Sequence, residues 1–377
     1  MKLLEEIIYI LKIIYYFIFV FLLYECVKVR EKKQNEIVAT NGKTIRRISI
    51  SCMTLFSIIL GHYSIICGKI PYVSDRLSYV VRFISDSYAK MHPTNSIGLV
   101  VIEKFLHIFT YNPSALFFFS SFIFLFITLY AYKRYEEASS MAILLMGLSN
   151  YCIYSFYLLK QAPAMAFAAL SFAEYSKNNK KLAIIYLIIA ICFHESAIIL
   201  IPLYLALMGS KSKLIKIAEY IFLICIVIFF EKINQNLVSL FSYIPGMSSQ
   251  LNVYLNEAGG INIATNILTV FKGIPFYIIT LVAAIKRKNL KEKIKNYDKY
   301  LLISTFASLV TILSSYMYWM YRFAAYCYFP TFIFASLIYK SMDSNKNKST
   351  FKFILCFTFF IVTLRLLIQY YFIYGGI

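Results

Sequence analysis

Apolar runs of about 20 residues recur along the whole of this 377-residue chain. A helix of that length crosses a hydrocarbon core of about 30 Å. Hydrophobic residues make up 60% of the chain and charged residues only 15%, whereas soluble domains contain roughly 45–50% apolar residues. A water-soluble core of this size could not bury so much apolar surface. The sequence therefore predicts an all-α, polytopic integral membrane helical bundle.

Hydropathy predicts about twelve transmembrane helices in a single domain covering residues 1–377. The first segment lacks a small-residue cleavage pattern, so it is read as a retained span rather than a signal peptide. The pair 182–194 and 196–208 can also be read as one long kinked helix, which lowers the count to eleven. The expected spans are 5–27, 48–67, 113–132, 138–158, 162–176, 182–194, 196–208, 214–230, 267–285, 300–317, 323–339 and 351–373.

The basic residues predict the orientation of these spans. Of the 38 lysines and arginines, 26 lie in six connections that fall on one side of the predicted membrane, namely 28–47, 133–134, 177–181, 211–216, 286–299 and 340–352. Lysine and arginine are retained on the cytoplasmic side of membranes, so both termini are predicted to be non-cytoplasmic. The net charge of +20 is thus a topology signal, and no nucleic-acid partner is expected.

The two longest connections on the predicted outer side are residues 68–112 and 231–266. The first contains the amphipathic run SIGLVVIEKFLHIF, in which Glu103, Lys104 and His107 interrupt the apolar residues. Such a segment cannot span lipid alone, and it suits a helix at the membrane interface. We expect an outer-face interfacial helix near 96–110.

Ionisable residues gather at the outer ends of several predicted spans, where charge is costly and therefore points to function. The run SDRLSYVVRF contains Asp75, Arg76, Tyr79 and Arg82. One reading is a solvated loop in which Asp75 pairs with an arginine, an interaction that contributes little. The other is a carboxylate that accepts a proton from a hydroxyl group, beside an arginine that binds phosphate.

Two further polar pairs interrupt apolar sequence at the same predicted face. Lys160 and Gln161 precede an alanine-rich segment; the lysine either snorkels to the interface or binds an anion. His194 and Glu195 lie side by side within an apolar run. The histidine is either satisfied by a backbone carbonyl or placed there for function.

Arg322 lies among aromatic residues that include Trp319. An aromatic belt at the membrane interface accounts for the tyrosines and the tryptophan. It does not account for the arginine, whose planar guanidinium binds phosphate groups bidentately. The chain has no cluster of acidic or Cys/His residues with metal-ligand spacing, so neither a metal nor a cofactor is expected.

Taken in order, these motifs resemble the EpsG-like family of bacterial polysaccharide polymerases, relatives of the Wzy O-antigen polymerases. The resemblance covers roughly residues 70–205. In the family the residue before the glutamine is commonly arginine, whereas here it is Lys160, which keeps the charge but loses the bidentate fork. The matching residues are Asp75, Tyr79 and Phe83, then Lys160, Gln161, Ala162, Ala164 and Ala166, then Phe193, His194, Ser196, Ala197, Ile199 and Pro202.

The resemblance implies an enzyme that joins oligosaccharide repeat units carried on undecaprenyl pyrophosphate, at the outer face of the cytoplasmic membrane, into a capsule, exopolysaccharide or O-antigen. A chain-length regulator and a flippase of the same pathway are implied partners. The acceptor hydroxyl attacks the anomeric carbon of the growing chain, and lipid pyrophosphate departs. On this reading Asp75 or His194 is the base and Arg322, Arg76 and Lys160 form the pyrophosphate clamp. The other predicted substrate-binding residues are Tyr79, Arg82, Gln161, Glu195 and Trp319.

Two other classes of membrane protein fit parts of the pattern. A flippase for lipid-linked oligosaccharides also has about twelve spans and cations for pyrophosphate, but it is expected to carry charges along the midplane of the bundle. A membrane O-acyltransferase acting on polysaccharide also uses a histidine, but normally with paired arginines and a second carboxylate. The clustering of charge at one rim favours the polymerase.

Overall fold

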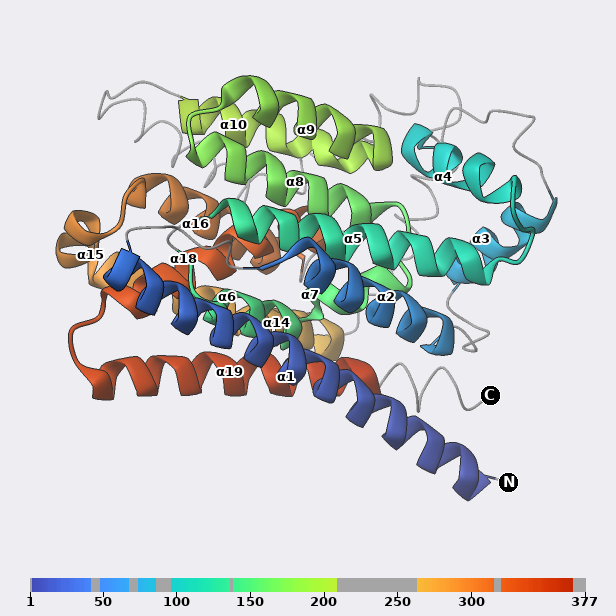
Figure 1. The fold of residues 1–377 in the computed structure, drawn as a ribbon, viewed down its shortest axis with the longest axis horizontal. Helices are drawn as coiled ribbons and strands as arrows, with labels where there is room; N and C mark the ends of the chain where they lie inside the picture. The colour runs from blue at the N-terminus through green and yellow to red at the C-terminus, as the bar shows by residue number, and fades with distance from the viewer. Residues whose placement is uncertain are drawn as a thin grey trace.

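The computed structural model describes residues 2–41, 48–67, 74–85, 96–135, 138–208, 263–314 and 320–368. Within these ranges it contains sixteen α-helices and two short 3₁₀-helices, which confirms the all-α prediction. Most helices run along the long axis of the molecule, with α3 and α4 at one end of the bundle and α15 at the other (Figure 1). The two ends are therefore built from different parts of the chain.

The helices have the following bounds: α1 Lys2–Asn41, α2 Ile50–Cys67, α3 Ser74–Ser85, α4 Ile97–His107, α5 Ser114–Arg134, α6 Ser140–Gly147, α7 Asn150–Ile153, η2 Tyr154–Phe156, α8 Gln161–Ser176, α9 Lys180–Phe193, η3 Glu195–Ile199, α10 Leu200–Met208, α14 Ile263–Ile285, α15 Arg287–Lys293, α16 Tyr297–Leu313, α17 Tyr321–Ala325, α18 Tyr328–Ser341 and α19 Asn345–Ile368.

Three helical segments are long and apolar enough to cross a membrane, namely Glu6–Lys33, Ser114–Arg134 and Asn345–Ile368. Shorter apolar helices cover Ile50–Ile66, Glu195–Leu207 and Phe271–Ile285. Apolar side chains point outward from the long helices: Phe21 on α1 and Phe353 on α19 are 59% and 67% exposed. A multi-pass membrane protein follows, because water would penalise such a surface.

The predicted span 214–230 and the outer connection 231–266 lie almost wholly in residues 209–262, outside the described part of the chain. A count of twelve spans thus stays a prediction. Helix α1 begins, and α19 ends, at the end of the bundle that carries α3 and α4 (Figure 1). Which side of the membrane this end faces also stays a prediction.

The first helix is longer than expected. Residues 28–47 were predicted to form a connecting loop, but α1 continues without a break to Asn41, so that prediction is wrong over most of its length. The segment after the apolar run is rich in Lys, Arg, Glu and Gln. These residues favour helix nearly as well as alanine does, and none of Gly or Pro interrupts them before Asn41.

The predicted single span 138–158 is broken into α6, α7 and η2. The break follows Gly147, whose carbonyl accepts a hydrogen bond from the buried Tyr16 hydroxyl on α1 at 2.7 Å. At the start of α7 the Ser149 hydroxyl accepts from the Tyr151 N–H at 3.2 Å, as an N-cap does. The Gly147 carbonyl and the Tyr151 N–H, which lie at the break, thus find hydrogen-bond partners inside the bundle.

Residues 180–208 form a hairpin rather than one kinked helix. The Ser171 hydroxyl on α8 donates to the carbonyl of Ala183, near the start of α9, and lies 2.6 Å from the hydroxyl of Tyr204 on α10. Both ends of the hairpin therefore meet α8 at the same level. The chain turns back at His194, whose extended backbone (φ −155°, ψ 119°) ends α9.

The predicted span 323–339 is likewise divided, into α17 and α18, by a turn in which the Cys327 N–H donates to the Ala324 carbonyl at 2.9 Å. The helix expected near 96–110 is present as α4. Its Ile97, Val101 and Phe105 are exposed, while Leu99 is fully buried. Helix α4 thus presents apolar side chains outward as well as inward and buries Glu103, so that its position at the membrane interface stays a prediction.

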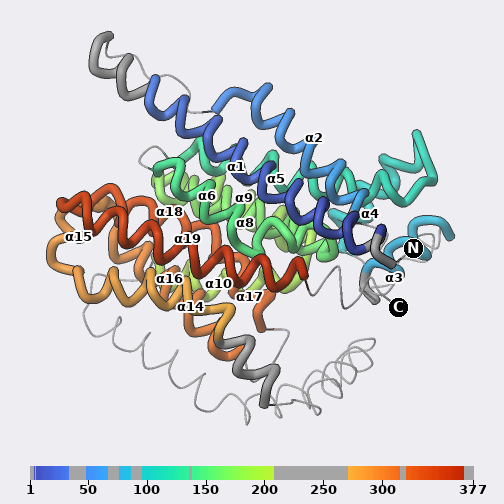
Figure 2. The backbone as a smooth tube through the Cα atoms, turned by 90° about the horizontal axis from the view of Figure 1, so that it is seen from below, coloured from blue at the N-terminus to red at the C-terminus, as the bar shows by residue number. Residues whose placement is uncertain are grey.

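Helix α8 lies at the centre of the packing, in contact with α5, α9 and α18. Its alanines permit this close approach, and five of them are fully buried: Ala162, Ala164, Ala166, Ala168 and Ala169. Seen from below, α1, α6 and α19 cover one side of this centre (Figure 2).

Replacing Gly147 by alanine should destabilise the contact between α6 and α1. A Cβ at Gly147 lies 2.5 Å from Cγ1 of Val20, so we expect a loss of about 1–3 kcal/mol in the free energy of unfolding, as for other overpacked sites. The measurement is the unfolding transition of purified protein in detergent. Adding Val20→Ala should recover much of the loss; a double variant no better than Gly147→Ala would contradict this packing.

Candidate functional site

Three segments that are distant in the sequence meet at the apex of the α9–α10 hairpin. The side-chain Nε2 of Gln161, the first residue of α8, donates to the backbone carbonyl of Arg322 on α17 at 2.6 Å. The hydroxyl of Ser196 on η3 lies 2.8 Å from that of Tyr326, which follows α17. Lys160, His194 and Arg322 are therefore brought to one end of the bundle, as the sequence motifs suggested.

His194 is held by the residue two positions after it. Its Nδ1 accepts a hydrogen bond from the Ser196 N–H at 3.1 Å and lies 2.7 Å from the Ser196 hydroxyl oxygen. The imidazole thus caps the first turn of η3. Tyr326, which is fully buried, fixes the Ser196 hydroxyl from the opposite side. The half-buried imidazole has one defined orientation as a result.

Charged groups surround this imidazole. Arg322, Lys160 and Glu195 all lie close enough to His194 to act on it electrostatically. The Lys160 ammonium lies 6.0 Å from the centroid of the Tyr79 ring on α3. The guanidinium of Arg322 lies over the Tyr321 ring at the same distance. Among the side chains that the structure describes here, two cations accompany one exposed carboxylate, and this part of the site suits an anionic ligand.

The residues that lead into Lys160 are not α-helical, yet they lie inside the bundle. Their carbonyls are satisfied by side chains of other helices: the Ser121 hydroxyl donates to Ser155 at 3.0 Å and the Ser120 hydroxyl to Leu159 at 2.9 Å. The guanidinium of Arg76 donates to the Phe156 carbonyl at 2.7 Å. Irregular backbone at membrane depth requires such partners. These bonds therefore position Lys160.

The side-chain amide of Gln161 is only partly satisfied by hydrogen bonds. Its side chain is 1% exposed, and while Nε2 bonds to Arg322, the buried Oε1 has no hydrogen-bond partner in the described part of the chain. Buried polar atoms are nearly always paired. The residue directly after Lys160 thus keeps one buried acceptor unsatisfied among the described residues.

A family model agrees with this arrangement of motifs. The model described as the EpsG family matches residues 64–375. The chain belongs to the EpsG family. Membership suggests a role in polysaccharide biosynthesis. No curated protein and no solved structure matches the chain.

In this EpsG-family protein, Arg76 has a structural task. Besides its bond to Phe156, it donates to the Ser64 carbonyl on α2 at 3.0 Å, and its guanidinium carbon lies 3.6 Å from the centroid of the Phe117 ring. It is 6% exposed. Arg76 thus ties α3 to α2, α5 and η2. Its predicted part in a pyrophosphate clamp stays a prediction.

Arg82 forms an ion pair with Glu103 of α4, at 2.9 Å between Nη2 and Oε2. Glu103 is fully buried, so this pair holds α3 against α4. One of the two readings of the sequence predicted that Asp75 pairs with an arginine of this segment. The backbone of Asp75 lies in the first turn of α3, but its side chain and all of Trp319 lie outside the described part.

The sequence analysis assigned no role to Ser196 or Tyr326. Ser196 was noted only as part of the matching run, and Tyr326 was counted with the aromatic belt. A hydroxyl two residues after a histidine that breaks an apolar run is a signal for a cap, since Ser side chains bond to nearby turns. Nothing local marks Tyr326, which is 130 residues away from Ser196.

Replacing Arg82 by glutamine should destabilise the EpsG-family protein by about 3–5 kcal/mol, because it leaves the Glu103 carboxylate buried without its charge partner. Adding Glu103→Gln should recover most of that loss, as measured by thermal unfolding in detergent. The control is Arg287→Gln, which removes an exposed arginine paired with Asp298 at 3.2 Å and should cost less than about 1 kcal/mol. Equal stability of the Arg82 and Arg287 variants would favour a role in substrate binding for Arg82.

Proposed function

We propose that this EpsG-family protein polymerises oligosaccharide repeat units carried on undecaprenyl pyrophosphate, at the outer face of the cytoplasmic membrane. The observation that carries the proposal is the meeting of Lys160 and Arg322 around the fixed imidazole of His194. A diphosphate leaving group needs positive charge and hydrogen-bond donors near the membrane surface. All three groups come together at one end of the bundle.

In the proposed reaction, a sugar hydroxyl of one lipid-linked unit attacks the anomeric carbon that joins the growing chain to its lipid pyrophosphate. The new glycosidic bond forms as the bond from the anomeric carbon to the pyrophosphate oxygen breaks. The bonding electrons leave with the pyrophosphate, where Lys160 and Arg322 stabilise the added charge. The hydroxyl proton passes to a carboxylate base, and the configuration at the anomeric carbon is inverted.

The hydrogen bonds of His194 favour one of its two predicted roles. Because Nδ1 accepts from the Ser196 N–H, the neutral ring carries its proton on Nε2. Nε2 is then a donor, suited to the departing pyrophosphate, and it has no hydrogen-bond partner in the described chain. A general base needs an unprotonated Nε2, which forces an N–H on Nδ1 against the Ser196 N–H. We therefore propose His194 as the donor and retain Asp75 as the base.

Alanine variants of the site should abolish polymer while leaving single repeat units on the lipid. In liposomes supplied with lipid-linked units, His194→Ala and Arg322→Ala should each lower polymer formation by roughly 10²–10³-fold, the cost of losing one oxyanion donor. Arg287→Ala, an exposed arginine on α15 at the far end of the bundle, is the matched control. Normal polymer from both site variants would refute the site assignment. Wild-type protein that makes no polymer but moves the units across the membrane would favour a flippase instead.

Glutamine and asparagine at position 194 separate a donor from a base. The amide nitrogen of His194→Gln reaches approximately to the place of Nε2, so this variant should keep part of the polymerising activity, whereas His194→Asn should match His194→Ala. Neither amide can act as a base at neutral pH. Polymer ladders from the same liposome assay give the comparison. If the His194→Gln and His194→Asn variants are both inactive, His194 returns to the role of base, and the polymerase proposal stays intact.

A further inference from the structure

The buried hydroxyl of Tyr326 has no part in the proposed reaction, yet it contacts the residue that caps His194. Tyr326 is fully buried in the turn between α17 and α18, so water cannot complete its hydrogen bonds. Among the described residues, its hydroxyl has a single hydrogen-bond partner, the Ser196 hydroxyl at 2.8 Å. An unpaired buried donor is costly. Tyr326 therefore donates its hydrogen to the Ser196 oxygen.

That donation determines the direction of the next hydrogen bond. The Ser196 hydroxyl oxygen lies 2.7 Å from Nδ1 of His194, and by distance alone either atom can be the donor. If Nδ1 were the donor, the Ser196 hydrogen would turn toward Tyr326, whose own hydrogen would then be buried without an acceptor. The Ser196 hydroxyl is therefore the donor, and Nδ1 must be unprotonated to accept. The hydrogen bonds run in one direction, from Tyr326 through Ser196 to the imidazole.

The fold holds Tyr326 in one place. Its turn is closed by the bond from the Cys327 N–H to the Ala324 carbonyl at 2.9 Å, and both of these residues are fully buried. Four residues before Tyr326, the Arg322 carbonyl accepts from the side chain of Gln161 on α8. One short segment thus carries both a carbonyl that is tied to α8 and the hydroxyl that orients the imidazole.

We propose that Tyr326 is a positioning residue for His194: its hydroxyl, acting through Ser196, holds the imidazole in the tautomer that carries its proton on Nε2. The Ser196 N–H favours the same tautomer, and the two hydroxyls exclude the alternative in which Nδ1 donates to the Ser196 oxygen. The value of this tautomer for catalysis rests on the proposed function, in which Nε2 donates to the departing pyrophosphate. The tautomer itself does not depend on that function.

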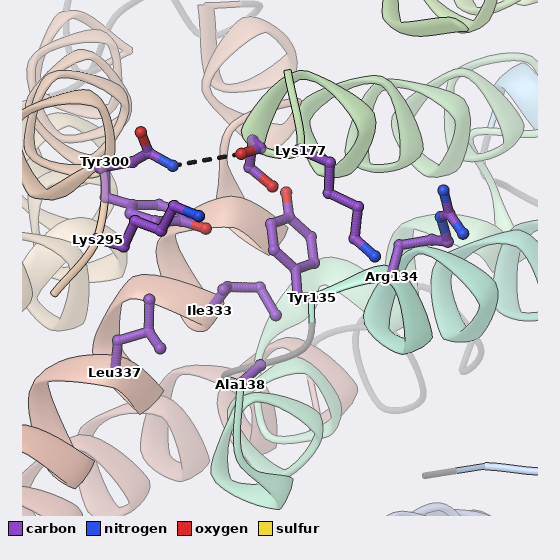
Figure 3. Close-up of a pocket in the computed structure, with 10 residues that line it drawn as sticks. Arg134, Tyr135, Ala138, Lys177, Lys295, Tyr300, Ile333 and Leu337 are labelled. Carbon is purple, nitrogen blue, oxygen red and sulfur yellow. Dashed lines mark hydrogen bonds between the residues drawn. The ribbon is translucent and has the colours of Figure 1, made fainter. Parts of the chain in front are cut away.

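The other end of the α9–α10 hairpin offers a matched contact. There the Tyr204 hydroxyl lies 2.6 Å from the Ser171 hydroxyl, and both side chains are buried. A further bond holds this end of α8, from the Asn296 side chain to the Ser176 carbonyl at 3.3 Å, drawn as the dashed line in Figure 3. Tyr204→Phe thus removes the same kind of contact as Tyr326→Phe does, at a place remote from the imidazole.

The test is the ¹⁵N spectrum of the full-length chain in detergent, labelled only at histidine and recorded at about pH 8, above the ordinary histidine pKa of about 6.5. The chain has four histidines, and the signals of His194 are those missing from His194→Gln. We expect an unprotonated Nδ1 in the wild type and in Tyr204→Phe, and an upfield shift of that signal toward the protonated form in Tyr326→Phe. A proton on Nδ1 in the wild type, or no shift in Tyr326→Phe, overturns the proposal.

A second variant serves where Tyr326→Phe fails to fold. Within the described structure, the Ser196 hydroxyl is the link between Tyr326 and the imidazole. Ser196→Ala removes this hydroxyl and keeps the backbone N–H, so Nδ1 should stay unprotonated, and its signal should move downfield because one donor is lost. The matched control is Ser171→Ala, which should leave the signals of His194 in place. An unmoved Nδ1 signal in Ser196→Ala overturns the proposal.

Polymerisation in liposomes gives a separate readout. A misplaced donor weakens an interaction made in the transition state, which lowers kcat and leaves KM unchanged. We expect Tyr326→Phe to lower kcat roughly fivefold to tenfold, the equivalent of one hydrogen bond, and Tyr204→Phe to match the wild type. Equal kcat values for the two variants overturn the positioning role. Wild-type protein that makes no polymer refutes the proposed function instead, and the tautomer measurement stands independently of it.

Discussion

In a hydrocarbon solvent, a helix can be interrupted only where the freed backbone groups find partners within the protein. The hairpin of α9 and α10 is interrupted at His194, and its partners are close at hand. The His194 N–H still bonds to the Ala190 carbonyl at 3.0 Å, the imidazole accepts from Ser196, and Tyr326 fixes the Ser196 hydroxyl. The contacts that make the break tolerable are the same contacts that orient the imidazole, so stability and chemistry depend on one set of bonds.

The second half of the site follows the same constraint. Lys160 lies at the end of an irregular stretch whose carbonyls are bonded by Ser120, Ser121 and Arg76. Arg76 is thus a positioning residue for Lys160. Gln161 then links this stretch to the carbonyl of Arg322. Each cation at the apex is thus held in place through hydrogen bonds of its backbone or of the backbone next to it.

Much of the helical framework could be predicted from hydropathy, because long apolar runs bounded by charges leave few alternatives. Helices α2, α5, α8 and α14 begin and end within a few residues of the predicted spans. The interruptions after Gly147 and at Tyr326 could not be predicted, since they depend on contacts with residues far away in the sequence. The bond from Tyr16 to the Gly147 carbonyl joins residues 131 apart, and no local pattern signals it.

The candidate site, like the fold, could be predicted only in part from the sequence. Charge in an apolar run singled out Lys160, His194 and Arg322, which the structure brings near one another, because such charges are costly wherever they lie. The same reasoning could not separate these residues from Arg76 and Arg82. The cost of burying the Arg76 charge is offset by hydrogen bonds to carbonyls, and that of Arg82 by its ion pair with Glu103. That distinction is set by three-dimensional partners. Ser196 and Tyr326 carry no charge and were missed for the same reason.

The continuous first helix has a mechanical consequence. Its 40 residues make a rod of about 60 Å at 1.5 Å per residue, roughly twice the hydrocarbon thickness of a bilayer. The start of its basic half is still held by the bundle, because Glu31 accepts from the Ser140 N–H of α6 at 2.8 Å and lies 3.7 Å from the Lys340 ammonium of α18. A shift of α1 along its own axis would therefore act on both ends of α6 at once, through Glu31 at its start and through Tyr16 at Gly147.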